Sequence, residues 1–383
     1  MLTQTTSSMR PSSSDTTMPR PEALVSRAAI QYPLEDQLPD TGQTVEVAPG
    51  VFWLRMGLPF ALNHINLWML RDHLPHPTQP GKVQEGWTLI DCGIDNPATR
   101  EAWLQLESHA LQGLPVLRVL VTHMHPDHMG LAHWLCERWQ APLWISTSEY
   151  QSALLACSGL YNFASQSTTA FYASHGWQQA KDPAALAKFS MGLYSSMVPK
   201  VPAAYVRLMA GASLRIGDRT WRCLGGYGHS PEHMALHDTE SRLLISGDML
   251  LPSISTNISV PAREPDGNPL AWFLASLDEM ADLPDATLVL PSHGRPFTGA
   301  ATRVAQLKTH HAERLAELLQ ACAQTEHCAH ELLLLIFKRP LDGHQTTFAM
   351  GEAVAHLNLL WLDGKLQRRL DDEGVYRFKT AQS

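Results

Sequence analysis

Short apolar runs separated by polar turns extend along the chain from about residue 45 to residue 300. Most of them are rich in β-branched and aromatic side chains and predict buried strands. Segments of helical character lie between them at 97–110, 129–139 and 269–281. This alternation predicts an α/β fold in which helices cover sheets. The predicted strands cover residues 51–56, 65–70, 87–90, 116–121, 142–146, 213–216, 221–224, 234–237, 243–246 and 287–290.

The alternation stops between residues 149 and 210, where Ala, Leu, Met and Gln predict helices and aromatic residues are frequent. The aromatic side chains either pack these helices together or line a substrate channel beneath a cap. Beyond residue 300 the pattern is again helical until a final pair of short strands, at 364–370 and 374–378, which is expected to form a hairpin. We therefore expect a disordered lead (1–30), a catalytic domain (31–300) with a helical cap inserted at 149–210, and a C-terminal domain (301–383).

The composition is that of a soluble globular protein, with 44% hydrophobic and 17% charged residues in 383. A net charge of −8 disfavours a general basic field for nucleic acid. The six cysteines include no Cys-x-x-Cys pair, which favours a reducing, cytoplasmic location. The Ser-, Thr- and Pro-rich lead lacks the apolar core of a secretory signal, although its arginines leave a transit peptide as a weaker alternative. The chain has no run of about 18 apolar residues, so no membrane span is expected.

The candidate chemistry is concentrated in residues 123–128, which read His-Met-His-Pro-Asp-His directly after a predicted strand. Alternation along this loop would direct His123 and His125 to one side and Asp127 with His128 to another. Imidazole nitrogens and carboxylate oxygens are the usual ligands of catalytic zinc. Incidental histidines in a polar loop are the weaker interpretation, since three occur within six residues.

Three downstream strands also end in residues able to bind a metal, namely His229, Asp248 and His293. Glycines at 225, 226 and 228 precede the first of them and would let the backbone approach a crowded site. Each of these positions is a weak signal alone. Their common context, the C-terminal end of a strand, predicts that they converge with the 123–128 cluster.

These residues, in this order, resemble the metallo-β-lactamase fold superfamily over roughly residues 45–300. The resemblance implies an αββα sandwich with two zinc ions per chain at one edge of the sheets. It implies His123, His125 and His229 on the first metal, and Asp127, His128 and His293 on the second. It also implies that Asp248 bridges both metals and that Asp91 orients ligands without binding metal.

The ligand types narrow the expected reaction to hydrolysis by a hydroxide shared between the metals. Position 125 is His, whereas the di-iron oxygen reductases of this superfamily carry an acidic residue there, so redox chemistry is disfavoured. The bridging Asp248 disfavours a native β-lactamase, because the true β-lactamases lack an aspartate bridge. It suits thioesterases resembling glyoxalase II, lactonases and nucleases equally, and Asp127 is the candidate proton shuttle.

Two features remain open. Many relatives carry Thr-Pro-Gly-His where this chain has Gly-Tyr-Gly-His at 226–229, and Tyr227 either donates to an oxyanion or stacks against the fold. The C-terminal helices and hairpin resemble the winged-helix tail of lactamase-β-like hydrolases, which either binds nucleic acid or buttresses the site. The expected substrate is a small-molecule ester or thioester. The alternatives are a single-strand ribonuclease, a lactonase and a non-catalytic binding protein, and the oligomeric state is left open.

Overall fold

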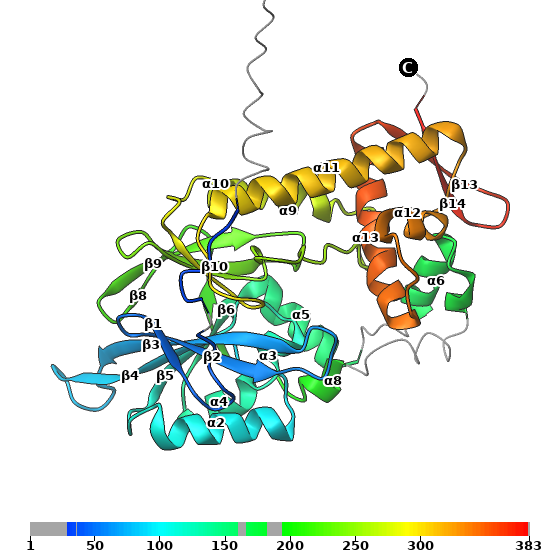
Figure 1. Ribbon diagram of the computed structural model, residues 1–383. Helices are drawn as coiled ribbons and strands as arrows, with labels where there is room; N and C mark the ends of the chain where they lie inside the picture. Colours follow the sequence, from blue (N-terminus) through cyan, green and yellow to red (C-terminus); the bar gives the residue numbers. More distant parts are fainter. Residues whose placement is uncertain (1–28, 36, 160–165, 182–193, 382–383) are drawn as a thin grey trace, which may run out of the picture.

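The computed structural model describes residues 29–35, 37–159, 166–181 and 194–381, and it contains two sheets that face each other (Figure 1). The larger sheet has seven strands in sequence order. Its first four strands pair antiparallel and the remaining pairs are parallel. The strands are β1 (Val45–Ala48), β2 (Val51–Gly57), β3 (His64–Pro75), β4 (Val83–Ile90), β5 (Val116–Leu120), β6 (Leu143–Ser146) and β7 (Tyr205–Leu208).

The second sheet has five strands in the order β12-β11-β10-β9-β8. A buried cluster between the sheets combines Trp53 and Trp68 of the first sheet with Ile216 and Trp221 of the second. Burial of these large side chains is the main stabilising contribution to the sandwich. The strands of this sheet are β8 (Ser213–Ile216), β9 (Arg219–Gly226), β10 (His233–Asp238), β11 (Leu243–Gly247) and β12 (Leu288–Pro291).

Helices cover the outer face of each sheet. On the first sheet, Trp103 and Leu135 from two helices pack into one core with Leu89 and Val119. A second core lies outside the other sheet and contains Phe273. The order helix, sheet, sheet, helix confirms the predicted αββα sandwich. The covering helices are α2 (Pro97–His109), α3 (Pro126–Met129), α4 (Ala132–Trp139), α9 (Pro269–Ser276), α10 (Asp278–Ala281) and α11 (Ala300–Gln324).

The segment predicted as a helical cap is helical in most of its described part, but not at its end. It contains α5 (Thr147–Cys157), α6 (Gln166–Ser174), the short 3₁₀ helix η1 (Gln178–Lys181) and α8 (Tyr194–Met197). The prediction of helix up to residue 210 is wrong at Tyr205–Leu208, which form β7 and pair with β6 at the sheet edge. Pairing with an existing strand decided the conformation there, and this pairing could not be read from local sequence.

The C-terminal segment forms a helical cluster and a hairpin beside α6 (Figure 1). Its elements are η2 (His330–Leu332), α12 (Leu333–Phe337), α13 (Gly343–Leu362), β13 (Leu366–Leu370) and β14 (Tyr376–Thr380). β13 and β14 pair antiparallel, which confirms the predicted hairpin. The Tyr172 hydroxyl donates to the Thr347 carbonyl at 3.2 Å, so the insertion and the C-terminal segment are in contact.

A capping box fixes the start of α13, which matters because this end of the helix faces the candidate site. The Asp342 side chain accepts from the Gln345 N–H at 2.8 Å, and the Gln345 side chain accepts from the Asp342 N–H. The winged-helix interpretation of the tail and the domain boundaries at 30 and 300 stay predictions. None of the helices within the described ranges is both long and apolar enough to cross a bilayer.

Candidate metal centre

The predicted ligands all follow the C-terminal ends of strands at one edge of the sandwich. β5 leads into His123 and His125, and α3 then carries Asp127 and His128. The loops after β9, β11 and β12 supply the remaining three, His229, Asp248 and His293. The structure brings these seven side chains into two adjoining groups.

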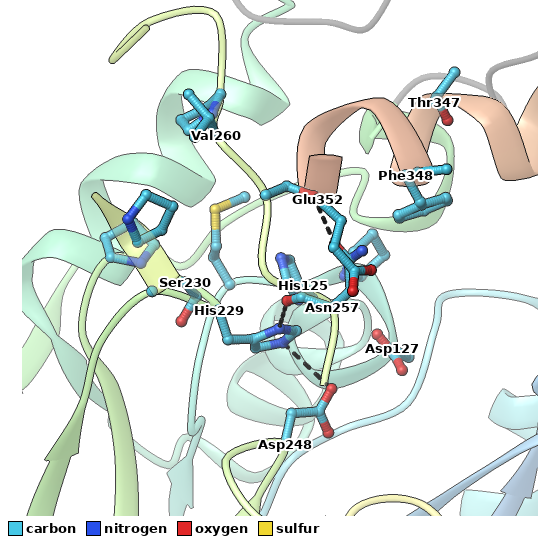
Figure 2. Close-up of a pocket in the computed structure, with 18 of the residues that line it drawn as sticks. His125, Asp127, His229, Ser230, Asp248, Asn257, Val260, Thr347, Phe348 and Glu352 are labelled. Carbon is cyan, nitrogen blue, oxygen red and sulfur yellow. Dashed lines mark hydrogen bonds and ion pairs between the residues drawn. The ribbon is translucent and has the colours of Figure 1, made fainter. Parts of the chain in front are cut away.

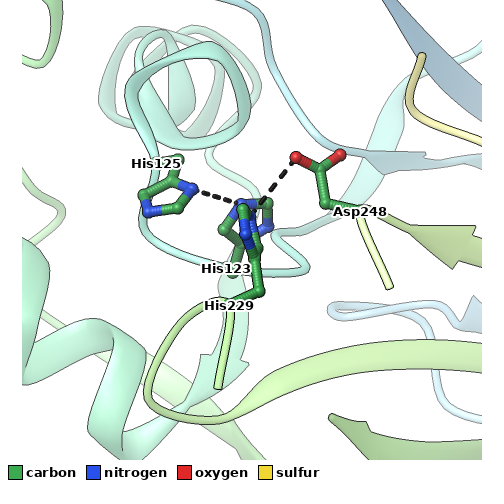
Figure 3. Close-up of side chains that lie close together, drawn as sticks. All are labelled: His123, His125, His229 and Asp248. Carbon is green, nitrogen blue, oxygen red and sulfur yellow. Dashed lines mark hydrogen bonds and ion pairs between the residues drawn. The ribbon is translucent and has the colours of Figure 1, made fainter. Parts of the chain in front are cut away.

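The first group consists of His123, His125, His229 and Asp248, whose ligand atoms lie within 4.8 Å of one another (Figure 3). His123 Nε2 is 2.9 Å from His125 Nδ1 and 3.2 Å from His229 Nε2. Three imidazole nitrogens this close to one carboxylate form a donor set of the kind that holds zinc.

The second group consists of Asp127, His128 and His293. His293 Nε2 lies 3.4 Å from Asp127 Oδ2, and His128 Nε2 lies 3.7 Å from the same oxygen. Asp248 reaches both groups, because its Oδ2 is 3.3 Å from His229 Nε2 and its Oδ1 is 3.5 Å from both His128 and His293. This is the placement expected of a bridging carboxylate.

The outer ring nitrogens of three histidines are held by the protein, which directs the opposite nitrogens into the cluster. His128 Nδ1 lies 2.7 Å from Asp91 Oδ2, while His229 and His293 donate Nδ1–H to backbone carbonyls at 2.8 Å. Asp91 also accepts from the Thr122 N–H at 2.8 Å and has a φ of 62°, a strained conformation for a non-glycine residue. The predicted orienting role of Asp91 agrees with these contacts.

Two glycines allow the ligand loops to approach their neighbours. Gly228, with a φ of 94°, precedes His229, and a Cβ there would lie 2.1 Å from the Pro269 carbonyl oxygen. Gly247 precedes Asp248, and a Cβ there would lie 2.1 Å from His233 Nε2. Both positions therefore require glycine.

Buried polar atoms without hydrogen-bond partners are evidence that this cluster binds a cation. Within the described residues, His128 Nε2 and Asp248 Oδ1 are buried and make no hydrogen bond. Buried polar atoms rarely stay unpaired, so atoms of this kind in a cluster of nitrogen and oxygen donors are consistent with metal coordination. The residues present fit two divalent ions, and metal binding by them stays a proposal.

The electrostatics differ between the two groups. Burial and the neighbouring imidazoles lower the pKa of His123 well below its usual range, and burial and His229 lower the pKa of His125 to about 3. Both rings are therefore neutral, which is the form that binds metal. In the second group burial disfavours charge, but the carboxylates of Asp248 and Asp127 outweigh it and raise the pKa of His293 to about 10.

Glu149 supports the site, although no sequence pattern indicated it. This buried carboxylate lies on α5 and accepts from the Met124 N–H at 2.9 Å, the Ser230 hydroxyl at 2.6 Å and the Glu232 N–H at 2.6 Å. It therefore joins the loop between His123 and His125 to the loop that follows His229. No local signal identifies it, because its partners lie 25 to 83 residues away in the sequence.

Tyr227 lies at the rim of the site, with 40% of its surface exposed. Its hydroxyl is 3.3 Å from the position that a Cβ on Gly225 would occupy, and its N–H donates to Ser276 Oγ at 3.0 Å. The predicted role as an oxyanion donor stays a proposal.

A cavity of about 1680 Å³ opens over the ligands (Figure 2). Its walls come from five parts of the chain: the metal loops, the loop at 58–62, the insertion through Tyr172 and Tyr194, the segment 257–279, and the C-terminal segment at 337–352. The volume exceeds the roughly 300–1,000 Å³ of ordinary ligand pockets. Tyr172 and Tyr194 of the insertion therefore line the cavity, whereas Tyr150, Phe171 and Trp177 are buried in the hydrophobic cores. The role of the insertion as a cap stays a prediction.

Comparisons with known proteins agree with this architecture. Residues 82–293 match the family model of the metallo-beta-lactamase superfamily. Residues 315–381 match that of the metallo-beta-lactamase-like C-terminal domain.

Individual relatives extend the match over most of the chain. A crystal structure of a beta-lactamase domain protein from Burkholderia ambifaria is 51% identical, with a TM-score of 0.84, and covers 94% of this chain and 100% of that one. A metallo-beta-lactamase family protein from Thermus thermophilus is 29% identical, with a TM-score of 0.69, over 88% of this chain and 100% of that one. The probable metallo-hydrolase YqjP of Bacillus subtilis (strain 168) is 22% identical over 87% of this chain and 98% of its own length. The chain belongs to the metallo-beta-lactamase superfamily.

Proposed function

We propose that the chain is a binuclear zinc hydrolase that cleaves a thioester or related ester of a small molecule. Two zinc ions at the two ligand groups would supply a water-derived nucleophile at neutral pH and polarise the acyl carbonyl. Water adds across the acyl–sulfur or acyl–oxygen bond, so the acyl carbon receives OH and the leaving group receives a proton.

In this proposal Asp127 carries the proton between the attacking water and the leaving group. Its carboxylate belongs to the second ligand group and lines the cavity, and its side chain is 18% exposed, so it can reach a bound substrate. Tyr227 lines the cavity together with His229 and would donate to the oxygen that becomes negative.

The observation that carries the ester assignment is the character of the cavity wall. The described lining is mostly apolar, which suits an acyl chain. Apart from the proposed ligands, its charged residues are four acids and two arginines, namely Glu264, Glu279, Asp342, Glu352, Arg263 and Arg339. A nuclease needs a basic path for phosphates, so this balance favours an ester without negative charge over a phosphodiester.

A substrate panel tests the assignment. The zinc-loaded chain should hydrolyse thioesters or lactones, and the His125→Ala and Asp248→Ala variants should lose this activity. Cleavage of single-stranded RNA without turnover of any ester would reject the assignment. A chain that binds no zinc and cleaves nothing would favour a binding protein on an inherited fold.

A further inference from the structure

The carboxyl group of Glu352 lies in the wall of the cavity that contains the proposed metal ligands. Glu352 belongs to α13 in the C-terminal segment, and only 8% of its surface is exposed. It lines the same cavity as His125, Asp127 and His229 (Figure 2). A carboxyl buried to this extent is normally hydrogen-bonded or ion-paired, because taking its charge out of water is unfavourable.

Glu352 lacks such a partner within the described part of the chain. Its backbone carbonyl accepts from His356 Nδ1 at 2.8 Å, but none of the described residues forms a hydrogen bond or ion pair with its carboxyl oxygens. Arg314 on α11 influences it electrostatically, yet that guanidinium is bound to Glu317 at 2.6 Å. Burial therefore dominates and raises the pKa of Glu352 to about 7. A ligand that brings its own hydrogen-bond donor would complete this site.

The charges around the cavity indicate which donor is favoured. Both arginines of the lining, Arg263 and Arg339, are at exposed positions, and Arg339 donates to Gln345 Oε1 at 2.7 Å. The arginines of the described lining are thus both on its exposed part, and Arg314, which influences Glu352, does not line the cavity. An anionic ligand group would be repelled at Glu352, whereas a cation would be attracted.

Aromatic residues at the same cavity point to the same ligand. Tyr227 and Trp272 both line it, and 40% and 42% of their surfaces are exposed. The faces of exposed aromatic rings attract alkylammonium groups through their π electrons.

We propose that Glu352 is a specificity-determining residue that binds a cationic amine carried by the acyl part of the substrate. The identification of the amine as part of a substrate rests on the proposed hydrolase function. The existence of an amine-binding site at Glu352 does not depend on that function. Tyr227 and Trp272, which line the same cavity, would attract the same positive charge. The C-terminal segment then selects the substrate, while the sandwich supplies the chemistry.

Calorimetric titration of the full-length chain with hexylammonium chloride and with hexanol tests the amine site directly. The two probes have the same alkyl chain and differ in charge. We expect the wild type to bind hexylammonium at least about tenfold more tightly than hexanol, as a buried charge-assisted hydrogen bond allows. Equal binding of the two probes, or no binding of either, would overturn the proposal without the use of any variant.

Two variants identify the residue. Glu352→Gln keeps the shape of the side chain and should remove the preference for the ammonium probe. Glu264→Gln removes an exposed acid from the same cavity wall and should keep the preference. A preference that survives in Glu352→Gln, or that is lost equally in Glu264→Gln, would assign the effect to general charge and not to Glu352.

A matched pair of thioesters separates this inference from the proposed function. Aminohexanoyl and hexanoyl thioesters of the same thiol differ only in the terminal amine. Ammonium binding without hydrolysis of either thioester would support the amine site at Glu352 and reject the hydrolase assignment. Hydrolysis of both at equal kcat/KM, with no ammonium binding, would keep the hydrolase and reject the site.

Discussion

The candidate metal centre and the cavity above it are built in opposite ways. Each proposed ligand follows a strand end, and four of the seven lie within six residues of sequence. The cavity wall instead combines the insertion, loops of the sandwich and the start of α13, which are far apart in the sequence. The difference indicates that most of the proposed ligands can be recognised from a local sequence pattern, whereas the cavity wall depends on how distant segments pack.

The largest expected effect comes from removing the carboxylate that reaches both ligand groups. Asp248→Ala should lower kcat/KM for ester hydrolysis by at least about a thousandfold, because both ions lose a ligand. Elemental analysis of the purified variant should show less zinc than the wild type. Asp218→Ala, which removes an exposed carboxylate from a turn, is the control and should keep both zinc and activity. An Asp248→Ala variant with full activity would show that the cluster is not the catalytic site.

This division also explains what could be predicted from the sequence. Residues 123–128 follow an apolar strand, so their grouping with His229, Asp248 and His293 could be anticipated from pattern and resemblance. Glu149 and Glu352 could not be, because a glutamate in a helical segment is usually a solvated surface residue. Their burial depends on loops and helices that pack against them from elsewhere in the fold. β7 was missed for the same reason, since its conformation depends on pairing with β6.

The second prediction concerns Glu352 in the cavity wall, which should make the stability of the folded chain depend on pH. Because burial raises the pKa of Glu352 from 4.5 to about 7, the folded chain keeps a proton in this range that the unfolded chain has released. The free energy of unfolding therefore falls as pH rises through this window, by up to about 3 kcal/mol. Glu352→Gln removes this loss.

Urea denaturation at about pH 5 and about pH 8 measures the difference. The free energy of unfolding of the variant minus that of the wild type should be larger at the higher pH than at the lower pH. A difference in stability that is the same at both values would contradict a buried, unpaired carboxyl at this position.

The next prediction concerns Glu149, whose hydrogen bonds position the loops that carry the proposed ligands. Glu149→Gln keeps the size of the side chain but weakens its hold on Met124, Ser230 and Glu232. Residues that support metal ligands typically change metal affinity by about 10- to 100-fold, and we expect a loss of zinc affinity in that range. Competition with a chromogenic chelator measures it. Glu232→Gln is the control, since among the described residues its carboxylate accepts only from Ser148. Comparable losses of zinc affinity in both variants would contradict a specific supporting role for Glu149.

The smallest expected effect is at the rim. Removing a buried oxyanion donor costs roughly 100- to 1,000-fold in kcat. Because Tyr227 is 40% exposed and water competes for its hydroxyl, we expect Tyr227→Phe to lower kcat by about tenfold with little change in KM. Steady-state kinetics on one thioester distinguish the two interpretations. An unchanged kcat would leave Tyr227 as a residue that only shapes the rim.

The most direct test of the account is a zinc titration of the metal-free chain, with ester hydrolysis as the readout. Seven ligands in two groups that share Asp248 predict that activity rises until two equivalents of zinc are bound per chain and then stays constant. Full activity at one equivalent, or hydrolysis that does not depend on zinc, would contradict a two-metal hydrolase.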